Sequence, residues 1–122
     1  MAVYFDHIAL PSRDDEASAR FFGSVLGLPV ARDGAEDEIP CVRLAVGRQV
    51  LFLRAETFTS HHAAFRVSPH EFVEVVERLR SMTVPFGNDP EAPTNGLVSD
   101  PLGGNGRVYF FDPNGHLLEV CA

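Results

Sequence analysis

The sequence predicts an α+β fold made of two βαβββ modules, and an internal repeat is the main observation behind this prediction. His62 repeats His7 after 55 residues, and Pro85 repeats Pro29 after 56. Each half also contains a segment with the apolar spacing of a helix, set between segments with the composition of strands. The chain of 122 residues is the right length for a single domain of this kind.

The first predicted module covers residues 1–56. Residues 3–10 alternate as a strand, which Pro11 and Ser12 end. Ser12 is expected to cap the next helix, which ends at Gly27. The apolar stripe of this helix is Ala17, Phe21 and Val25. The module is completed by an edge piece at 28–31, an acidic turn at 33–38, and strands at 39–46 and 49–55 that meet in a tight hairpin at Gly47 and Arg48.

The second predicted module covers residues 57–122 and repeats this order. A strand at 62–67 precedes a helix that begins with a capping box of Ser68 and Glu71. The helix carries Phe72, Val76 and Leu79 on its apolar face, residues 84–86 mirror the edge piece, and strands follow at 107–112 and 116–121.

The second module also holds about a dozen extra residues, which fall between Gly87 and Gly106. This stretch is rich in Gly, Pro and Asn, so we expect a long irregular loop. Such loops are either lids over binding sites or surface insertions, and the sequence leaves both open.

Composition narrows the classes of function. Asp and Glu outnumber Lys and Arg by 17 to 10, and the net charge of −7 argues against nucleic acid or an anionic membrane as a partner. No apolar run is long enough to span a bilayer, and the first ten residues lack the basic start of a signal peptide, so we expect a cytoplasmic protein. Cys41 and Cys121 lack redox-motif spacing and are expected to be free thiols in the core.

Three side chains are candidate metal ligands because of their strand positions. Residues two apart share a face of a strand, and this phase turns His7, His62 and Glu119 away from the helices. An unpaired carboxylate within the apolar strand of Glu119 would be costly, and a divalent metal would relieve that cost. Two histidines and one carboxylate also leave coordination positions open for a substrate. The alternative is two hydrogen-bonded sheet histidines with Glu119 exposed at an edge, and His70 and His116 are expected to lie in solvent.

Several motifs carry a family resemblance. They are Asp6-His7-Ile8-Ala9-Leu10, Ala19-Arg20-Phe21-Phe22, Leu26-Gly27-Leu28, His62-Ala63-Ala64-Phe65, and the run from Val108 through Asp112-Pro113-Asn114-Gly115-His116-Leu117-Leu118 to Glu119. Over nearly its whole length the chain resembles the vicinal oxygen chelate superfamily. That superfamily includes glyoxalase I, fosfomycin-resistance enzymes, extradiol dioxygenases, methylmalonyl-CoA epimerase and bleomycin-resistance proteins. The resemblance implies curved mixed sheets with the helices on their outer face.

The resemblance also implies a ligand set. The family's metal ligands correspond to His7, His62 and Glu119, and Fe, Mn, Ni, Co or Zn would suit them. The family pattern His-x-Ala-Phe favours His62 over its neighbour His61. At the place of the fourth ligand of glyoxalase I this chain has Leu51, and Gln49 lies two residues early, so we expect that ligand to be missing.

Three further residues are candidates for contacts with a substrate. Tyr109 matches a tyrosine on the penultimate strand of the fosfomycin enzymes and is a candidate catalytic hydrogen-bond donor or acid beside Glu119. The arginine that follows the ligand glutamate in those enzymes has no counterpart here, and Arg66 and Arg107 are candidates to bind an anionic substrate group in its place. The alternative for each arginine is a surface ion pair.

The resemblance therefore implies a metal-dependent enzyme that binds two neighbouring oxygens of a small molecule and stabilises an oxyanion. Lyase, isomerase, transferase and dioxygenase chemistry all remain open, and family members commonly work as homodimers. The alternatives are a metal-free protein that sequesters a drug, as the bleomycin-resistance proteins do, and a degenerate member with no chemistry.

Overall fold

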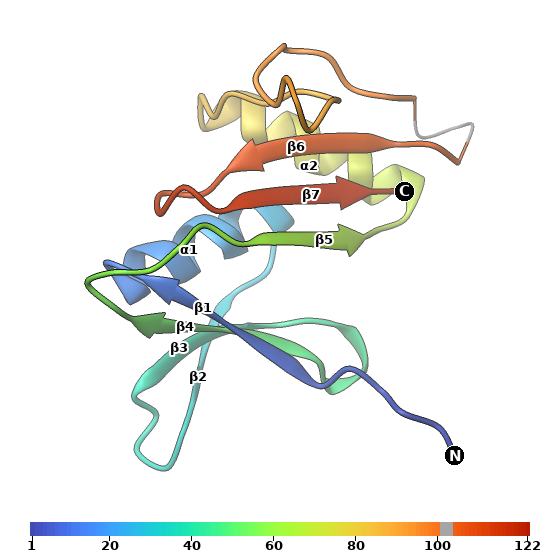
Figure 1. The fold of residues 1–122 in the computed structure, drawn as a ribbon. Coiled ribbons are helices and arrows are strands. Elements are labelled where there is room, and N and C mark those ends of the chain that lie inside the picture. The colour runs from blue at the N-terminus through green and yellow to red at the C-terminus, as the bar shows by residue number, and fades with distance from the viewer. Residues whose placement is uncertain (101–103) are drawn as a thin grey trace. The chain divides into compact units, whose positions relative to one another are not determined.

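The computed structural model describes residues 1–100 and 104–122 and divides the chain into two compact units, Met1–Thr59 and Ser60–Ala122. Each unit has one α-helix and one mixed sheet (Figure 1), which confirms the α+β class. Among the described residues, neither helix is long and apolar enough to cross a membrane.

The first unit is a four-stranded sheet in the order β1-β4-β3-β2. β1 (His7–Ser12) runs parallel to β4 (Gln49–Arg54), while β3 (Ile39–Arg43) pairs antiparallel with β4 and with β2 (Val30–Asp33). β3 and β4 form the predicted hairpin, but its connection is longer than Gly47 and Arg48 and contains one turn of 3-10 helix, η1 (Ala45–Gly47).

The beginning of this unit differs from the prediction. β1 starts at His7 rather than at residue 3, and it continues through Pro11 and Ser12 because these residues pair with the last residues of β4. Proline is tolerated there because β1 is an edge strand. Ser12 is buried and donates its hydroxyl to the Leu10 carbonyl, and Asp14 instead caps the helix by accepting from the Ala17 N–H at 3.0 Å.

Helix α1 (Asp15–Leu26) ends at Gly27, as predicted, with that glycine in the left-handed conformation. Its buried face, however, is centred on Ala19, Phe22 and Val25, while the predicted Ala17 and Phe21 are only half-buried. The buried face also includes the small residues Ser18 and Gly23, which let the helix approach its neighbours closely. A Cβ on Gly23 would lie 2.5 Å from the Leu28 carbonyl oxygen.

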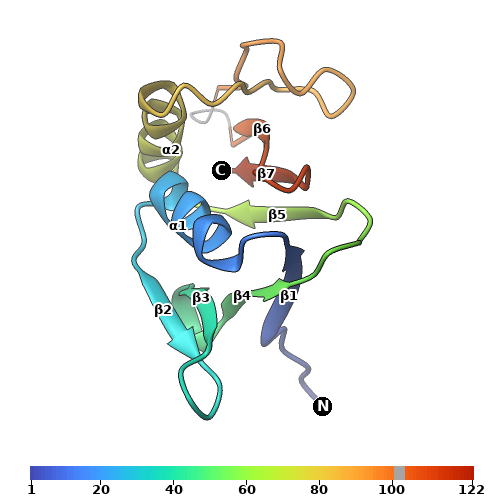
Figure 2. The same ribbon diagram turned by 90° about the vertical axis from the view of Figure 1, so that its left-hand side faces the viewer.

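The second unit is a sheet in the order β5-β7-β6, with α2 (Pro69–Ser81) covering one face (Figures 1 and 2). β5 (His62–Arg66) is parallel to the central β7 (Leu117–Cys121), and β6 (Arg107–Phe111) is antiparallel to it. Both parts of the Ser68–Glu71 capping box are present, and the predicted apolar face of α2 is buried. Prediction and structure agree closely for this helix.

No strand forms at 84–86, and the outer edge of β6 instead has two isolated bridges, Gly87 with Tyr109 and Ser99 with Arg107. The chain turns back immediately after Gly87, and a Cβ on Gly87 would lie 2.6 Å from the Ala92 carbonyl oxygen. The amides of Asn88 and Asn95 hydrogen-bond at 2.9 Å across this turn. The described part of the predicted loop is therefore held by its own hydrogen bonds, and residues 101–103 of that loop lie outside the described residues.

Candidate functional site

The open face of the second sheet, opposite α2, gathers four of the predicted site residues. β7 is the central strand, and its Glu119 is in register with Ala64 of β5 and with Tyr109 of β6. Paired residues share a face, and so do residues two apart along a strand. His62 and Arg107 therefore lie on the same face as Glu119 and Tyr109. Leu118 and Val120 point the other way and are buried on the helix side, as the strand phase predicts.

Glu119 is held by two neighbours. Its side chain is only 12% exposed, and its Oε1 lies 3.2 Å from His62 Nε2. Its other oxygen, Oε2, lies 3.2 Å from Arg107 Nε. The alternative of a glutamate exposed at an edge is therefore wrong. The Arg107 guanidinium compensates the carboxylate charge, so the burial of Glu119 does not by itself require a metal.

The imidazole of His62 is fixed by its other nitrogen. His62 Nδ1 lies 2.8 Å from the Leu117 carbonyl oxygen, and a carbonyl can only accept, so Nδ1 carries the hydrogen. In the neutral ring Nε2 then has a lone pair directed at Glu119 Oε1, which is also an acceptor. The two atoms therefore need something positive between them, either a hydrogen on Nε2 that is donated to the carboxylate or a bound cation. A histidine that donates one nitrogen to a carbonyl and offers the other is the usual arrangement of a metal ligand, so the pair fits a divalent cation.

Tyr109 lies beside this pair. Its ring stacks on His62 with centroids 6.2 Å apart and an interplanar angle of 21°, and the residue is 8% exposed. Burial raises the pKa of the Tyr109 phenol, and the charge of Glu119 raises it further. The phenol is therefore protonated at neutral pH, which makes it a hydrogen-bond donor.

The two candidate arginines differ in their environment. Arg107 forms an ion pair with Glu119, as the alternative for the arginines predicts. Its partner, however, is a residue of the site and not an acidic residue elsewhere on the surface. Arg66 is exposed at the end of β5, on the same face as His62. Within residues 1–100 and 104–122, no ion pair involves Arg66.

His7 belongs to the first unit, where it begins β1. Its side chain is 50% exposed, and its Nδ1 lies 2.7 Å from Asp6 Oδ2, which leaves Nε2 as the available nitrogen. Gln49 is its register partner on β4 and donates from Nε2 to Asp33 Oδ2 at 3.3 Å. Leu51, at the place of the fourth ligand, is buried. Taken by itself, neither unit gathers three His, Cys, Asp or Glu side chains around a metal position within its described residues.

The prediction that His116 lies in solvent is wrong, because this residue is completely buried. Its Nδ1 accepts from the His61 backbone N–H at 2.9 Å, and the two rings are 5.3 Å apart. The spacing from Asp112 to His116 indicates a turn in which the aspartate accepts from the His116 N–H, but it does not predict the burial of the ring. His70, in contrast, is exposed as predicted and pairs with Glu74.

Both cysteines are free and buried, as predicted. Burial raises the pKa of the Cys41 thiol, so that this group stays protonated at neutral pH.

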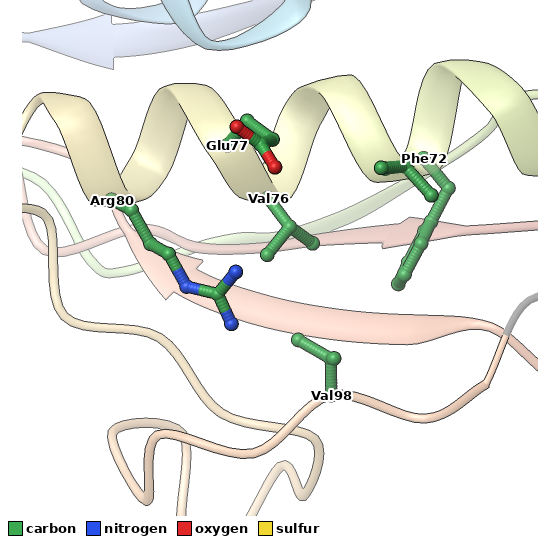
Figure 3. Close-up of a pocket in the computed structure, with 6 residues that line it drawn as sticks. Phe72, Val76, Glu77, Arg80 and Val98 are labelled. Atoms are coloured by element: carbon green, nitrogen blue, oxygen red, sulfur yellow. The ribbon is translucent and has the colours of Figure 1, made fainter.

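A separate pocket of about 150 Å³ lies between α2 and the segment around Val98 (Figure 3). It is lined by apolar groups of Phe72, Val76 and Val98 and also by Glu77 and Arg80. None of the predicted site residues lines this pocket.

Comparisons with known proteins bear on this site. The sequence model of the Glyoxalase/Bleomycin resistance protein/Dioxygenase superfamily matches residues 4–120. The structure of the oxidase ChaP-H2 is similar, with 31% identity and a TM-score of 0.86 over 98% of this chain and 93% of its own. The oxidase ChaP-H1 is 29% identical, with a TM-score of 0.86 over 98% and 94%.

A curated relative matches more locally. The fosfomycin resistance protein FosX of Listeria monocytogenes serovar 1/2a (strain ATCC BAA-679 / EGD-e) is 37% identical over 65 residues. That match covers 52% of this chain and 42% of the relative, so less than half of FosX is represented in it.

Proposed function

Because the chain belongs to the Glyoxalase/Bleomycin resistance protein/Dioxygenase superfamily, we propose that it is a divalent-metal-dependent enzyme acting on a small molecule with two neighbouring oxygens. The single observation that carries this proposal is the geometry of His62. Its Nδ1 donates to the Leu117 carbonyl, and its Nε2 meets Glu119 Oε1 at 3.2 Å. A nitrogen and an oxygen ligand are thereby oriented for one cation.

The proposed ligands are His62 and Glu119 of the second unit, with His7 as the third, because the internal repeat makes it the counterpart of His62. Imidazole and carboxylate ligands accept Fe, Mn, Ni, Co or Zn. When bound, such a metal supplies Lewis-acid stabilisation of negative charge on a substrate oxygen.

The neighbouring side chains have distinct proposed roles. Tyr109, protonated at neutral pH, donates a hydrogen bond or a proton to a substrate oxygen. Arg66 has an unpaired guanidinium in the described part of the chain and binds an anionic group of the substrate. Arg107 holds Oε2 of Glu119, so that Oε1 remains directed at His62, and its other N–H groups are further candidates for contact with the substrate.

Two reaction classes have specific support. Oxidation is the first, because the similarity to two proteins named as oxidases extends over 98% of this chain. A reaction on fosfomycin or a related phosphonate is the second, because of the local match to FosX and the tyrosine at position 109. The exposed guanidinium of Arg66 suits the phosphonate group of such a substrate.

The metal content of the purified protein is the direct test. We expect about one transition-metal equivalent per chain after purification without chelators, and its loss in the His7→Ala, Glu119→Ala double variant and in His62→Ala. His70→Ala is the matched control, because His70 is exposed on α2 and should not alter the metal content. Iron would direct the assays to oxidation, and manganese, nickel, cobalt or zinc to the phosphonate and to isomerase or lyase substrates.

Absence of metal in the parent after loading would overturn the proposal. The metal-free alternative, a drug-sequestering protein, would then lead, and binding of bleomycin-like ligands would replace kinetics. We also propose that the protein is a homodimer, as is common in the family, and sedimentation equilibrium of the purified chain tests this independently of metal.

A further inference from the structure

We propose that His116, which is buried and outside the proposed ligand set, is a positioning residue that fixes the His62 imidazole against Glu119. This inference rests on the proposed function, since it concerns the orientation of a proposed ligand. The observation behind it is an unbroken series of hydrogen bonds within the second unit, from the His116 ring to the His62 ring.

The series has three links. His116 Nδ1 accepts from the His61 N–H at 2.9 Å. The His61 carbonyl accepts from the Leu117 N–H at 2.9 Å. The Leu117 carbonyl then accepts from His62 Nδ1 at 2.8 Å, and this last bond leaves Nε2 facing Glu119. Each link therefore constrains the next, so that the His116 side chain orients the His62 ring through the backbone of His61 and Leu117.

The first link lies where regular sheet pairing stops. β5 begins at His62, so the His61 N–H is outside the named strand and its acceptor is a side chain rather than the backbone of β7. Without an acceptor there, the end of β5 would lose one of the bonds that hold it beside β7, and the bonds from Leu117 to His61 and from Ser60 to Gly115 would remain. Fraying at this end would displace His62 first, because it is the first residue of the strand.

His116 is itself held rigidly. The Asp112 carboxylate accepts from the His116 and Asn114 backbone N–H groups, both at 2.9 Å, and the Asp112 N–H donates to the His116 carbonyl at 3.0 Å. Ser60 donates its hydroxyl to the Gly115 carbonyl at 2.8 Å, which ties the same turn to the segment before β5. The turn from Asp112 to His116 thus serves as an anchor for the β5 end that carries His62.

The test uses two substitutions at position 116, one expected to release the His62 ring and one expected to leave it in place. His116→Phe keeps a buried ring but removes the acceptor for the His61 N–H. His116→Asn keeps an acceptor oxygen close to the position of Nδ1. Val76→Ala is the control for general destabilisation, because Val76 is buried in α2 and takes no part in the series.

The first readout needs no metal. Nitrogen-15 NMR of the metal-free protein at pH 8 should show His62 protonated on Nδ1 in the parent, in His116→Asn and in Val76→Ala. In His116→Phe the two ring nitrogens of His62 should give averaged shifts, because the ring exchanges between tautomers. A parent-like His62 spectrum in a folded His116→Phe variant would overturn the inference.

The second readout is the dissociation constant for Mn²⁺, added alone and followed by calorimetry. We expect binding about 10- to 100-fold weaker in His116→Phe, with His116→Asn and Val76→Ala close to the parent. Equal affinities in the parent and in His116→Phe would overturn the positioning role. A parent that binds no transition metal would overturn the proposed function instead, and the NMR result would then decide the inference by itself.

Discussion

Glu119 connects the charged and polar groups of the site, because His62 and Arg107 both contact its carboxylate. Its carboxylate is 12% exposed on the central strand, so it needs a charged or hydrogen-bonding partner on each oxygen. Arg107 serves one oxygen and His62 the other. The arginine therefore has a structural role that exists whether or not a metal or substrate is present.

Removal of that arginine should reduce stability. Arg107→Gln leaves the Glu119 charge buried with one partner fewer, and we expect a loss of about 1 kcal/mol, because the 39% exposure of the Arg107 side chain screens the pair. Urea denaturation at pH 7 measures this change. Arg66→Gln is the matched control on the same face and should leave the midpoint unchanged, and an equal loss in both variants would contradict the assignment.

Glu71 gives a prediction about pH. Hydrogen bonds with the Ser68 side chain and backbone lower the pKa of Glu71 from its ordinary value of 4.5. A lowered pKa in the folded state means that the carboxylate contributes stability at neutral pH and loses this contribution as the pH falls through the folded value. The parent should therefore lose stability below pH 4.5 more steeply than Glu71→Gln, whose amide keeps the capping geometry without titrating.

The measurement for Glu71 is the urea midpoint at intervals from pH 7 to pH 3. Parallel curves for the parent and for Glu71→Gln across that range would show that Glu71 does not contribute. Glu77→Gln is a useful control, because this glutamate lies on the same helix outside the capping box.

The elements that depend on local signals were predictable from the sequence. Helix α2 has its capping box, its N-terminal proline and its apolar face in adjacent positions, and all of these features recur in the structure. The start of the first unit was not predictable in this way. The extension of β1 through Pro11 and Ser12 depends on parallel pairing with β4, which lies some forty residues away in the sequence.

The site was predictable to a similar extent. Strand phase correctly turned His62 and Glu119 to the open face, because alternation is a local property. The partners of Glu119 were not predictable, because Arg107 reaches it diagonally from another strand. The burial of His116 was also missed, since it depends on contact with His61, 55 residues earlier.

In helix α1, we expect a substitution of glycine by alanine to lower the stability of the protein, which is the opposite of its usual effect. Replacing glycine by alanine inside a helix usually stabilises it by about 1 kcal/mol. Gly23→Ala should instead destabilise the protein by about 2 kcal/mol, because the new Cβ would lie 2.5 Å from the Leu28 carbonyl oxygen. Thermal unfolding tests this, with Ser24→Ala on the exposed side of the same helix as the control. A Gly23→Ala variant as stable as the parent would show that the close approach is not essential.

At the scale of the whole molecule, the repeat of a helix and a mixed sheet is the main organising feature. Both sheets place a parallel pair of strands beside an antiparallel one, in the orders β1-β4-β3-β2 and β5-β7-β6. In the second unit, a bridge at Gly87 and a hydrogen-bonded loop stand where the first unit has its outer strand. The repeat predicts a histidine at the same position in each unit, and His7 and His62 each begin a first strand.

If the proposed metal binds only the folded protein, it should stabilise the whole chain. A free metal concentration 100 times the dissociation constant adds about 2.7 kcal/mol, which corresponds to a rise of roughly 10 °C in the melting temperature. Differential scanning calorimetry with and without Mn²⁺ measures this shift. Glu119→Ala should abolish the shift and His70→Ala should retain it, and a shift retained in Glu119→Ala would place the ion elsewhere.

The parallel pairing of β5 with β7 has a consequence for the folding of the protein. His62 and Glu119 are 57 residues apart in the sequence, and α2 and the long loop lie between them. No hairpin or single helix brings the two side chains together, so they meet only when the crossover from β5 to β7 is closed. A nascent chain that still lacks β7 therefore has no pair of His62 and Glu119 to bind a cation. During refolding, the rate at which these two side chains come together measures the rate at which β5 pairs with β7.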